Sequence, residues 1–524
     1  MKNHKTLLLA VLLHLMLIGS NVSASTSGSS YSEGSNSNDN QYLSSYYEQR
    51  SKLVKDDQEL AIGSTVYFTT QEEQANSIFE QIVLNDELTY SNIDPPSYNT
   101  LYEASTIQNM ETFKILQKFP KGSALHLHQD SSATYDYLIQ VGTYLPNCYY
   151  YIGQANANFS YGSYYFFDEQ PDDGDWVLLE TVRSQQANVT EFDNQLYLNL
   201  TLIGRDTGDY VELWRNFDSI FSKTSGLVTY VPIAEGYLQH MIDQMIGDNI
   251  QHVELRKPFA TYYNLNGTTY NDTWYIELVE RLVKENQQKY NMPCFNVKII
   301  GADFRHNPKD VVMKHLQESL VLRNQYPYTF IGFDLDGPED LGYPLIYYID
   351  EFAAIYEAGI DQYYSLDYYF HAGETILYNN TNLYDAILLN SQRIGHGFSI
   401  QRYPVLMEVL IEKNIGLEIC PISNQVLEFY TNIRSHPVAS LMNSGVTVTI
   451  SSDDPAIYGY AGTSLDFFEV VFSAGLNLKQ LKQLALNSLD QSAFYDDTER
   501  DLNYAQWESS WKEFVSYIIT TYSQ

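Results

Sequence analysis

The sequence predicts a (β/α)8 barrel preceded by a helical N-terminal region, and three observations indicate this fold class. The chain has 524 residues, 44% of them hydrophobic, which is enough to bury a large core, in two or more domains or in one big barrel with additions. From residue 120 onward, eight short apolar runs rich in β-forming residues recur, with helical patterns between most of them. Many of these runs end in chemically competent side chains, as expected where barrel strands end at the catalytic face.

The first 24 residues have the order of a secretory signal. Lys2 and Lys5 precede an apolar run at 7–18, and small residues follow up to Ala24, after which we expect cleavage. The run is short for a bilayer span, so a membrane anchor is the less favoured interpretation. We therefore expect residues 1–24 to be a signal peptide and the mature protein to be secreted and extracellular. Six Asn-x-Ser/Thr sequons fit such a glycoprotein: Asn158, Asn188, Asn199, Asn266, Asn271 and Asn379.

Composition excludes several classes of function. The formal net charge is -35, from 30 Lys and Arg against 65 Asp and Glu. Such a chain repels phosphate backbones and anionic lipid headgroups, so we expect no nucleic-acid partner. No later apolar run is long enough for a membrane span. The three cysteines cannot form a disulfide framework, and no CxxC pair is present for a thiolate zinc site.

Two regions precede the predicted barrel. Residues 25–40 are rich in Ser, Gly and Asn and predict a flexible leader. Residues 41–118 predict a helical region, with apolar residues three to four apart at 75–83. Pro95-Pro96 interrupts this region, and the helical pattern resumes at 102–119. The barrel region itself is then expected at 119–524.

The barrel strands are expected at the eight apolar runs. Most intervals between them suit one strand and one helix, but the interval from His128 to His252 is far too long. We therefore expect an inserted subdomain at about 140–212, and its Tyr/Asn/Asp-rich sequence with three sequons suggests a glycosylated surface. The runs are 122–128, 250–256, 297–303, 330–337, 368–374, 393–397, 415–421 and 446–454.

The first run ends in His126-Leu-His128. Residues two apart on a strand point to the same side, so both imidazoles can enter the barrel mouth together. Two neutral imidazoles there are a natural start for a zinc site. Taken alone, an HxH pair is more often two ordinary histidines, and it gains weight here from its place directly after an apolar strand.

Later runs end in further candidate residues. His371-Ala-Gly-Glu374 places a carboxyl just past a strand end, where it can transfer protons; the alternative is a solvated loop glutamate. His396 lies between two glycines in a tight turn, and a hydrogen-bonded loop histidine is the alternative there. Asp453 and Asp454 are adjacent carboxylates that repel each other unless a cation or a donor compensates. One of them could instead cap the helix that Pro455 begins.

The order of these fragments closely resembles the adenosine deaminase group of the amidohydrolase superfamily, and most closely its secreted adenosine deaminase-related growth factors. The similarity covers roughly residues 75–520, together with the signal peptide. It is carried by HxH, HAGE, the Gly-flanked His and Ser-Asp-Asp, and by the strings at 188–193, 214–217, 333–340, 420–427, 436–439 and 451–456. Matched strings of this length are highly specific.

The resemblance implies one zinc ion per subunit and hydrolysis of adenosine, and of 2′-deoxyadenosine, to inosine and ammonia. Zinc lowers the pKa of a bound water toward neutrality. By resemblance, His396 orients this water, Asp454 accepts its hydrogen bond, and Glu374 protonates N1 of adenine. The implied zinc ligands are His126, His128, His371 and Asp453.

The resemblance also implies contacts to the substrate, and at one of them this sequence departs from the family pattern. Gly337 is expected to meet N3 through its N–H, and Trp214 to line the ribose end. In the animal relatives an aspartate directly after the HxH pair contacts ribose; here that place is Gln129, so Asp130 is the expected contact. The relatives' disulfide in the insertion is not expected, because Cys148 lacks a nearby partner.

Four alternatives stay open or are excluded at this point. A cytidine-deaminase fold is excluded because its PCxxC motif is absent. An AMP deaminase must hold a phosphate, which the negative charge opposes, although a few local arginines could overturn that argument. A different nucleoside or the adenine base is a further alternative substrate. A secreted growth factor that binds a receptor on a barrel with little activity is the alternative from another class.

The resemblance also implies partners. Residues 41–118 resemble the family's N-terminal dimerisation region, so a homodimer is expected. A cell-surface receptor or a glycosaminoglycan is a further candidate partner. Growth-factor-like signalling and catalysis are compatible, since removing extracellular adenosine is itself a signal.

Overall fold

The computed structural model describes residues 37–91, 93–97, 100–156, 159–172, 174–204, 209–362 and 365–523. The expected signal peptide, most of the expected leader and the sequon at Asn158 lie outside the described residues. The chain divides into two compact units, Met1–Gln58 and Glu59–Gln524. The described part of the first unit, residues 37–58, lies within helix α2 (Ser37–Leu60), on which Tyr46, Tyr47 and Leu53 are exposed.

The second unit begins with helices that precede the barrel. Helix α3 (Thr70–Thr89) starts with a capping box between Thr69 and Glu72, which satisfies backbone N–H groups that the first turn leaves free. The helical pattern at 102–119 forms two short helices, α4 (Ala104–Ile107) and α5 (Glu111–Lys118), instead of one. Asn109 lies between them and donates to the carbonyl of Ser105 at 2.8 Å, a side-chain bond that competes with a continuous helix.

Eight parallel strands form the barrel, as the sequence predicts. They make two four-stranded sheets, each in chain order. The isolated parallel bridges Phe333–Tyr368 and Leu127–Asp453 join the edges of the two sheets and so close the cylinder. The first sheet is β1 (Gly122–His128), β5 (Ile250–Pro258), β8 (Asn296–Phe304) and β9 (Phe330–Asp336). The second is β10 (His371–Ala372), β11 (Arg393–His396), β12 (Gly416–Ile419) and β13 (Val448–Ile450).

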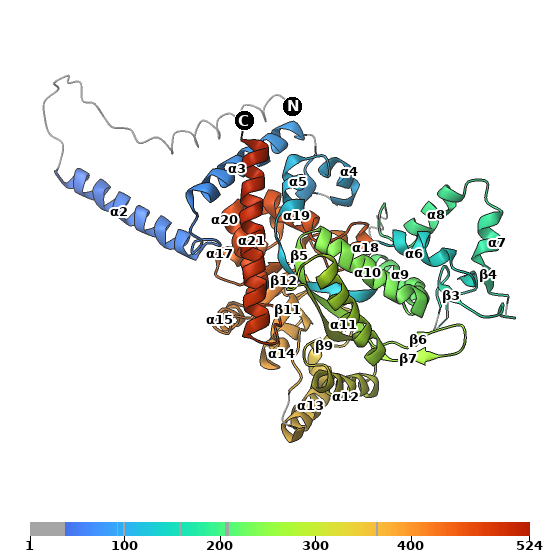
Figure 1. Ribbon diagram of the computed structural model, residues 1–524. Coiled ribbons are helices and arrows are strands. Elements are labelled where there is room, and N and C mark those ends of the chain that lie inside the picture. Colours follow the sequence, from blue (N-terminus) through green and yellow to red (C-terminus); the bar gives the residue numbers. More distant parts are fainter. Residues whose placement is uncertain are drawn as a thin grey trace. The chain divides into compact units, whose positions relative to one another are not determined.

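Helices follow the strands and surround them (Figure 1). Their apolar faces pack on the strands in one continuous core, which is the arrangement expected of alternating strands and helices. The helices of the barrel region after β1 and its insertion are α10 (Val231–Gly247), α11 (Asp272–Lys289), α12 (Lys309–Gln325), α13 (Ile349–Gln362), α14 (Asn382–Leu388), α15 (Pro404–Glu412), α16 (Pro421–Val426), α17 (Val438–Asn443), α18 (Pro455–Tyr458), α19 (Ser464–Ala474), α20 (Leu478–Asp490) and α21 (Asp497–Tyr522).

The segment between β1 and β5 contains a small sheet of its own. Strands β2 (Cys148–Tyr151), β3 (Tyr164–Phe166) and β4 (Trp176–Leu178) pair antiparallel in the order β3-β2-β4, and they appear in teal in Figure 1. Tyr149, Tyr151 and Trp176 form its core. The same segment holds α6 (Asp136–Gln140), α7 (Leu179–Ser184), α8 (Val189–Leu198) and α9 (Tyr210–Val228).

Cys148, Cys294 and Cys420 are all free and buried in the structure. Among the described residues, no helix combines the length and the apolar character that crossing a bilayer requires.

Candidate active site

The four predicted metal ligands meet at one end of the barrel. His126, His128, His371 and Asp453 each offer a ligand atom, and these atoms all lie within 4.8 Å of one another. The alternation of β1 turns both of its histidines to the same side, while His371 begins β10 and Asp453 follows β13. The Oδ1 atom of Asp453 lies 3.2 Å from Nε2 of His126 and 3.2 Å from Nε2 of His128.

The polar atoms of this cluster are poorly satisfied by protein alone. Nε2 of His126 and Oδ1 of Asp453 are buried without a hydrogen-bond partner, although a buried polar group without a partner is costly. Three imidazole nitrogens and one carboxylate oxygen form a donor set that divalent metals use in proteins. The residues therefore fit a metal ion.

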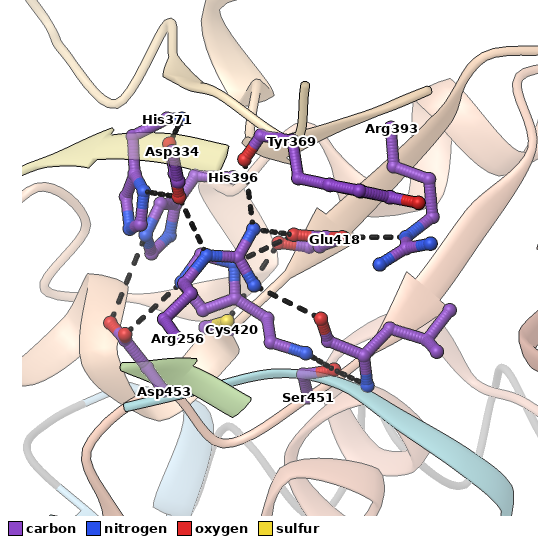
Figure 2. A network of polar contacts seen from close by, with 12 residues as sticks. Arg256, Asp334, Tyr369, His371, Arg393, His396, Glu418, Cys420, Ser451 and Asp453 are labelled. Carbon is purple, nitrogen blue, oxygen red and sulfur yellow. Dashed lines mark hydrogen bonds and ion pairs between the residues drawn. The ribbon is translucent and has the colours of Figure 1, made fainter. Parts of the chain in front are cut away.

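A second layer of carboxylates orients two of the histidines. Nδ1 of His126 lies 2.8 Å from Glu418 of β12, and Nδ1 of His371 lies 2.7 Å from Asp334 of β9. Because a carboxylate accepts a hydrogen bond, each Nδ1 carries the ring proton and each Nε2 is left free to bind a metal. Arg256 of β5 joins the two carboxylates, donating to Asp334 at 2.7 Å and to Glu418 at 2.6 Å, as Figure 2 shows.

These buried charges stabilise one another. Burial alone would raise the pKa of Glu418, but the charges of Arg256 and Arg393 outweigh burial and hold it well below its usual range. Asp334 behaves in the same way, with the charges of His371 and Arg256 lowering its pKa against burial. The second layer is therefore ionised at neutral pH. Sequence reasoning did not assign a role to Arg256, Asp334 or Glu418. Each is a charged residue inside an otherwise apolar strand, and this pattern is the signal that could have identified it.

Negative charge dominates the mouth of the barrel. Burial alone would lower the pKa of His128, but the negative charges of Asp454 and of Asp453, whose Oδ1 atom is 3.2 Å away, outweigh it and raise the pKa to about 10. Asp336, at the end of β9, lies 3.6 Å from His128, and burial raises its pKa to about 7. Such a cluster of carboxylates favours a bound cation. Asp336 is a further residue that sequence reasoning did not assign.

Glu374 faces the cluster just after β10. Its Oε1 atom lies 3.5 Å from Nε2 of His396 and is buried without a hydrogen-bond partner. Burial, followed by the charges of Asp453 and Glu339, raises the pKa of Glu374 well above its usual range. A raised pKa favours the protonated form of a carboxyl group, which is the form that can donate a proton. The alternative of a solvated loop glutamate is therefore wrong.

His396 ends β11 in a left-handed backbone conformation, with φ of 57°. The glycines on both sides make this turn fit. A Cβ atom at Gly395 would lie 2.9 Å from the ring of His126, and one at Gly397 would lie 2.5 Å from Leu417. The Gly-His-Gly sequence thus lets His396 approach the ligand cluster, with its Nε2 atom 3.8 Å from Oδ2 of Asp453.

Asp453 and Asp454 diverge from each other. Oδ2 of Asp453 accepts from Ser423 at 2.7 Å, whereas Asp454 accepts from Ser131. Burial and then the charge of Asp453 raise the pKa of Asp454 well above its usual range. Asp454 occupies the N-cap position of α18, but its side chain makes no capping hydrogen bond there. Its carboxyl group is therefore directed to the site and not to the helix.

One pocket unites the cluster with the predicted substrate contacts. Asp130, Trp214 and Gly337 all line it, and the buried Nε1 atom of Trp214 has no hydrogen-bond partner. The wall also includes Asp218 of α9, which sequence reasoning did not assign. The remaining lining residues are His128, Phe217, Phe221, Pro258, Phe304, Asp336, His371, Glu374, His396, Leu427, Asp453 and Asp454.

Comparisons with known proteins agree with this geometry. A family model described as "Adenosine deaminase" matches residues 220–505, and one described as "Adenosine/AMP deaminase N-terminal" matches residues 7–116. The chain is 54% identical over 491 residues to adenosine deaminase 2 of Dictyostelium discoideum, covering 94% of this chain and 90% of that protein. It is 33% identical over 492 residues to adenosine deaminase 2 of Homo sapiens, covering 90% and 94%.

A solved structure supports the fold. The apo N6-methyl-AMP deaminase of Arabidopsis thaliana superposes with a TM-score of 0.53 at 17% identity, covering 76% of this chain and 99% of that one. At this identity the likeness concerns the barrel architecture alone. The family matches and the long relatives carry the assignment: the chain belongs to the adenosine deaminase family and is a deaminase enzyme.

Proposed function

We propose that this protein is a secreted, zinc-dependent adenosine deaminase that converts adenosine, and 2′-deoxyadenosine, to inosine and ammonia. The observation that carries the proposal is the meeting, in a single pocket, of four ligand side chains with Glu374, a buried carboxyl group whose pKa is raised well above its usual range. This arrangement combines a site for a Lewis acid with a proton donor, which are the two groups that hydrolytic removal of an aromatic amine needs.

The metal is proposed to be one zinc ion per subunit. Its ligands would be His126, His128, His371 and Asp453, a set of nitrogen and oxygen donors that suits zinc and leaves a position for water. Zinc held there would activate a water molecule as a nucleophile near neutral pH. The second layer supports this proposal, because hydrogen bonds from ring nitrogens to carboxylates hold metal-binding histidines in the required tautomer.

The protein side chains would then carry out the proton chemistry. Glu374 gives its proton to N1 of the purine, which makes C6 electrophilic. The oxygen of a water molecule adds to C6, and Asp454 and His396 hold that oxygen by hydrogen bonds. Asp454 takes up one proton of that water and passes it to the amino group, the C6–N6 bond breaks and ammonia leaves, and the hydroxyl proton left on the product returns to Glu374. The buried, raised-pKa environment of Glu374 supports its role as the donor.

The pocket wall supports a nucleoside as the substrate. Gly337 would meet N3 of the base, while Asp130 and Trp214 would contact the ribose. No Lys or Arg is among the described residues that line the pocket, and phosphate recognition generally relies on such cations. The alternative of an AMP deaminase is therefore disfavoured. Adenine as substrate would leave the Asp130 and Trp214 end of the pocket unused.

Secretion and glycosylation belong to the same proposal. Five of the sequon asparagines lie within the described residues, namely Asn188, Asn199, Asn266, Asn271 and Asn379, and all five are exposed. Exposure is what an attached glycan requires. Protein recovered from the culture medium should begin after Ala24 and lose mass on treatment with a glycosidase. Retention of the untruncated chain in cells would contradict the proposal.

A homodimer through residues 41–118 is proposed as well. Exposed apolar residues on one helix, such as Tyr46, Tyr47 and Leu53 of α2, are typical of a surface that a partner covers. Light scattering should give twice the mass of the glycosylated chain, and deletion of residues 41–58 should lower it. A monomer at micromolar concentration would contradict this part of the proposal.

Signalling is proposed to act through the removal of adenosine. If so, a cellular response to this protein should disappear in the inactive Glu374→Gln variant and be reproduced by another adenosine-consuming enzyme. A response that survives Glu374→Gln would instead favour direct binding to a receptor or a glycosaminoglycan.

The central test combines metal analysis with turnover. Wild-type protein should contain one zinc per chain and should convert adenosine to inosine, and a chelator should abolish that conversion. Glu374→Gln should keep its zinc but lose about 10²- to 10⁴-fold or more in kcat, because a glutamine amide cannot give a proton to N1. Near-normal activity in this variant would refute the role of Glu374, and a folded, zinc-loaded wild type without turnover would refute the function.

A further inference from the structure

Three buried side chains form a hydrogen-bonded chain that ends at the candidate active site. Nε2 of His436 lies 3.2 Å from Oδ1 of Asn424, and Nδ2 of Asn424 lies 3.2 Å from Nδ1 of His396. At its far end, Nδ1 of His436 accepts the backbone N–H of Val438 at 3.1 Å. His396, Asn424 and His436 are each no more than 3% exposed, so water does not compete for these bonds.

The backbone fixes the direction of every donor in this chain. The N–H of Val438 can only donate, so Nδ1 of His436 must offer a lone pair. Burial lowers the pKa of His436 to about 3, so the ring is neutral and its single proton sits on Nε2. That proton goes to Oδ1 of Asn424, and the amide then presents its NH₂ group to His396. A reversed amide would place two donors opposite each other at His436.

His396 is consequently left with its proton on Nε2. Its Nδ1 atom accepts from Asn424, and a neutral imidazole carries one ring proton. The Nε2–H then points toward Oε1 of Glu374 at 3.5 Å and Oδ2 of Asp453 at 3.8 Å. His396 therefore offers the pocket a donor and not a lone pair.

Packing holds the chain in place. The ring of His436 lies edge-on to Tyr430 and Phe398, with centroids 4.7 and 5.4 Å away. The backbone of Asn424 is held on both sides, since its N–H donates to Cys420 at 3.0 Å and its carbonyl accepts from Tyr430 at 3.1 Å. Neither side chain can turn without breaking these contacts, so the direction of the hydrogen bonds is built into the fold.

We propose that Asn424 and His436 are positioning residues that hold His396 as the Nε2–H tautomer, so that His396 donates a hydrogen bond to the attacking oxygen and does not take its proton. The tautomer follows from the hydrogen bonds alone, whereas the use of the donor rests on the proposed function. Asp454 is then the neighbouring group that can accept a hydrogen bond from the attacking oxygen. Of the two adjacent aspartates, Asp453 contacts the ligand histidines, whereas Asp454 bonds Ser131.

Two substitutions at His436 separate its two hydrogen bonds. In His436→Asn, the amide oxygen can still accept the N–H of Val438 two residues on, as in an Asx turn, but the donor to Asn424 is lost. In His436→Gln, the amide NH₂ can reach the place of Nε2 and restore that donor. We expect kcat to fall about ten- to hundred-fold in His436→Asn, since a weakened donor costs part of the roughly 10²- to 10³-fold that complete loss of one such donor costs.

Measurements of KM, zinc content and the recovery of kcat distinguish this positioning role from a purely structural one. KM for adenosine and zinc content should stay within about twofold of wild type in His436→Asn, and His436→Gln should recover most of the lost kcat. Ser435→Ala, at the exposed neighbouring position, should leave all of these quantities unchanged. Loss of zinc in His436→Asn without rescue by Gln, or an unchanged kcat, would overturn the proposal.

Nitrogen NMR of the zinc-loaded, histidine-labelled protein reads the tautomer directly. Nδ1 of His396 should have the chemical shift of an unprotonated ring nitrogen and Nε2 that of a protonated one. In Asn424→Asp the new carboxylate can only accept, so Nδ1 of His396 should become protonated. A protonated Nδ1 in the wild type would overturn the proposal. This NMR test remains decisive even if the wild type turns over no adenosine, because the tautomer of His396 is measured without catalysis.

Discussion

The carboxylate of Glu339 accepts a hydrogen bond from the backbone N–H of Glu374 at 2.6 Å. Its other oxygen accepts the N–H of Gly373 at 2.9 Å and the amide of Asn382 at 2.8 Å. Glu339 thus fixes the backbone of Glu374, and its negative charge is one of the causes that raise the pKa of that residue. A single buried carboxylate therefore serves both the position and the protonation of the proposed proton donor.

Replacement of Glu339 by Gln should impair both effects. One amide oxygen cannot accept all three hydrogen bonds, and we expect kcat to fall about 10²-fold, the scale of a misplaced catalytic group. Glu374 must be protonated to donate, and loss of the neighbouring charge lets it ionise at lower pH. The alkaline limb of the pH profile for kcat/KM should therefore move to lower pH.

Asp340→Asn provides the control for that variant. Asp340 is the next residue along, but it bonds Thr375 and Asn380 and does not bond the backbone of Glu374. Its substitution should leave the alkaline limb close to that of the wild type. A limb that moves equally in both variants would mean that general pocket charge, and not Glu339, sets the protonation of Glu374.

Asp334 should govern metal affinity without touching the metal. It accepts from Nδ1 of His371 at 2.7 Å, from the backbone N–H of His371 at 2.8 Å and from Arg256 at 2.7 Å. In Asp334→Asn, an amide NH₂ group must face one of these donors. We expect zinc affinity to fall about 10- to 100-fold, as is usual for a second-shell partner, in a competition titration with a chelating dye. Asp367→Asn, half-buried outside the site beside Arg323, should keep wild-type affinity; equal loss in both would contradict the assignment.

The carboxylates in the pocket wall should discriminate against nucleotides. Asp218 is exposed to solvent at the rim of the pocket, and partial desolvation by its surroundings raises its pKa to about 6, so it is ionised in an assay at pH 8. At an effective dielectric constant of about 20, two unit charges about 10 Å apart repel by about 1.7 kcal/mol, or more than tenfold in rate. Asp218→Asn should therefore lower the preference for adenosine over AMP, measured as the ratio of kcat/KM values, by roughly tenfold. Glu212→Gln, exposed in the first turn of the same helix, is the matched control, and an unchanged ratio in Asp218→Asn would argue against electrostatic exclusion.

The ligand cluster could be predicted because its residues stand at strand ends. In a closed parallel barrel those ends meet at one face, so strand-end positions placed His126, His371 and Asp453 at the same face, and the resemblance to the adenosine deaminase group selected them as ligands. Arg256 and Glu418 were beyond this reasoning, because each lies inside an apolar strand and its partner depends on the register between strands. The helical pattern at 102–119 was similarly incomplete, since periodicity marks the apolar face but not the turn that divides α4 from α5.

A prediction on stability concerns Glu72, where α3 meets the C-terminal helices. Its carboxylate accepts the N–H of Thr69 at 2.7 Å, Nζ of Lys482 at 2.6 Å and Nε1 of Trp511 at 2.6 Å. Burial would raise the pKa of Glu72, but these bonds outweigh burial and lower it from 4.5 to about 2. Folding therefore favours the ionised form, so the contribution to stability is complete above about pH 4.5 and is lost as the pH falls toward about 2.

Glu72→Gln should consequently be less stable than the wild type at pH 7, and the difference in melting temperature should shrink steadily between about pH 4.5 and about pH 2. Glu73→Gln alters the exposed neighbouring residue of the same helical turn and should show no such convergence. Thermal unfolding followed by circular dichroism at a series of pH values measures both. A protonated carboxyl and an amide should bind Lys482 about equally weakly, so the two proteins should have similar melting temperatures near pH 2. A difference in melting temperature that persists unchanged to pH 2 would show that Glu72 acts through the shape of its side chain alone.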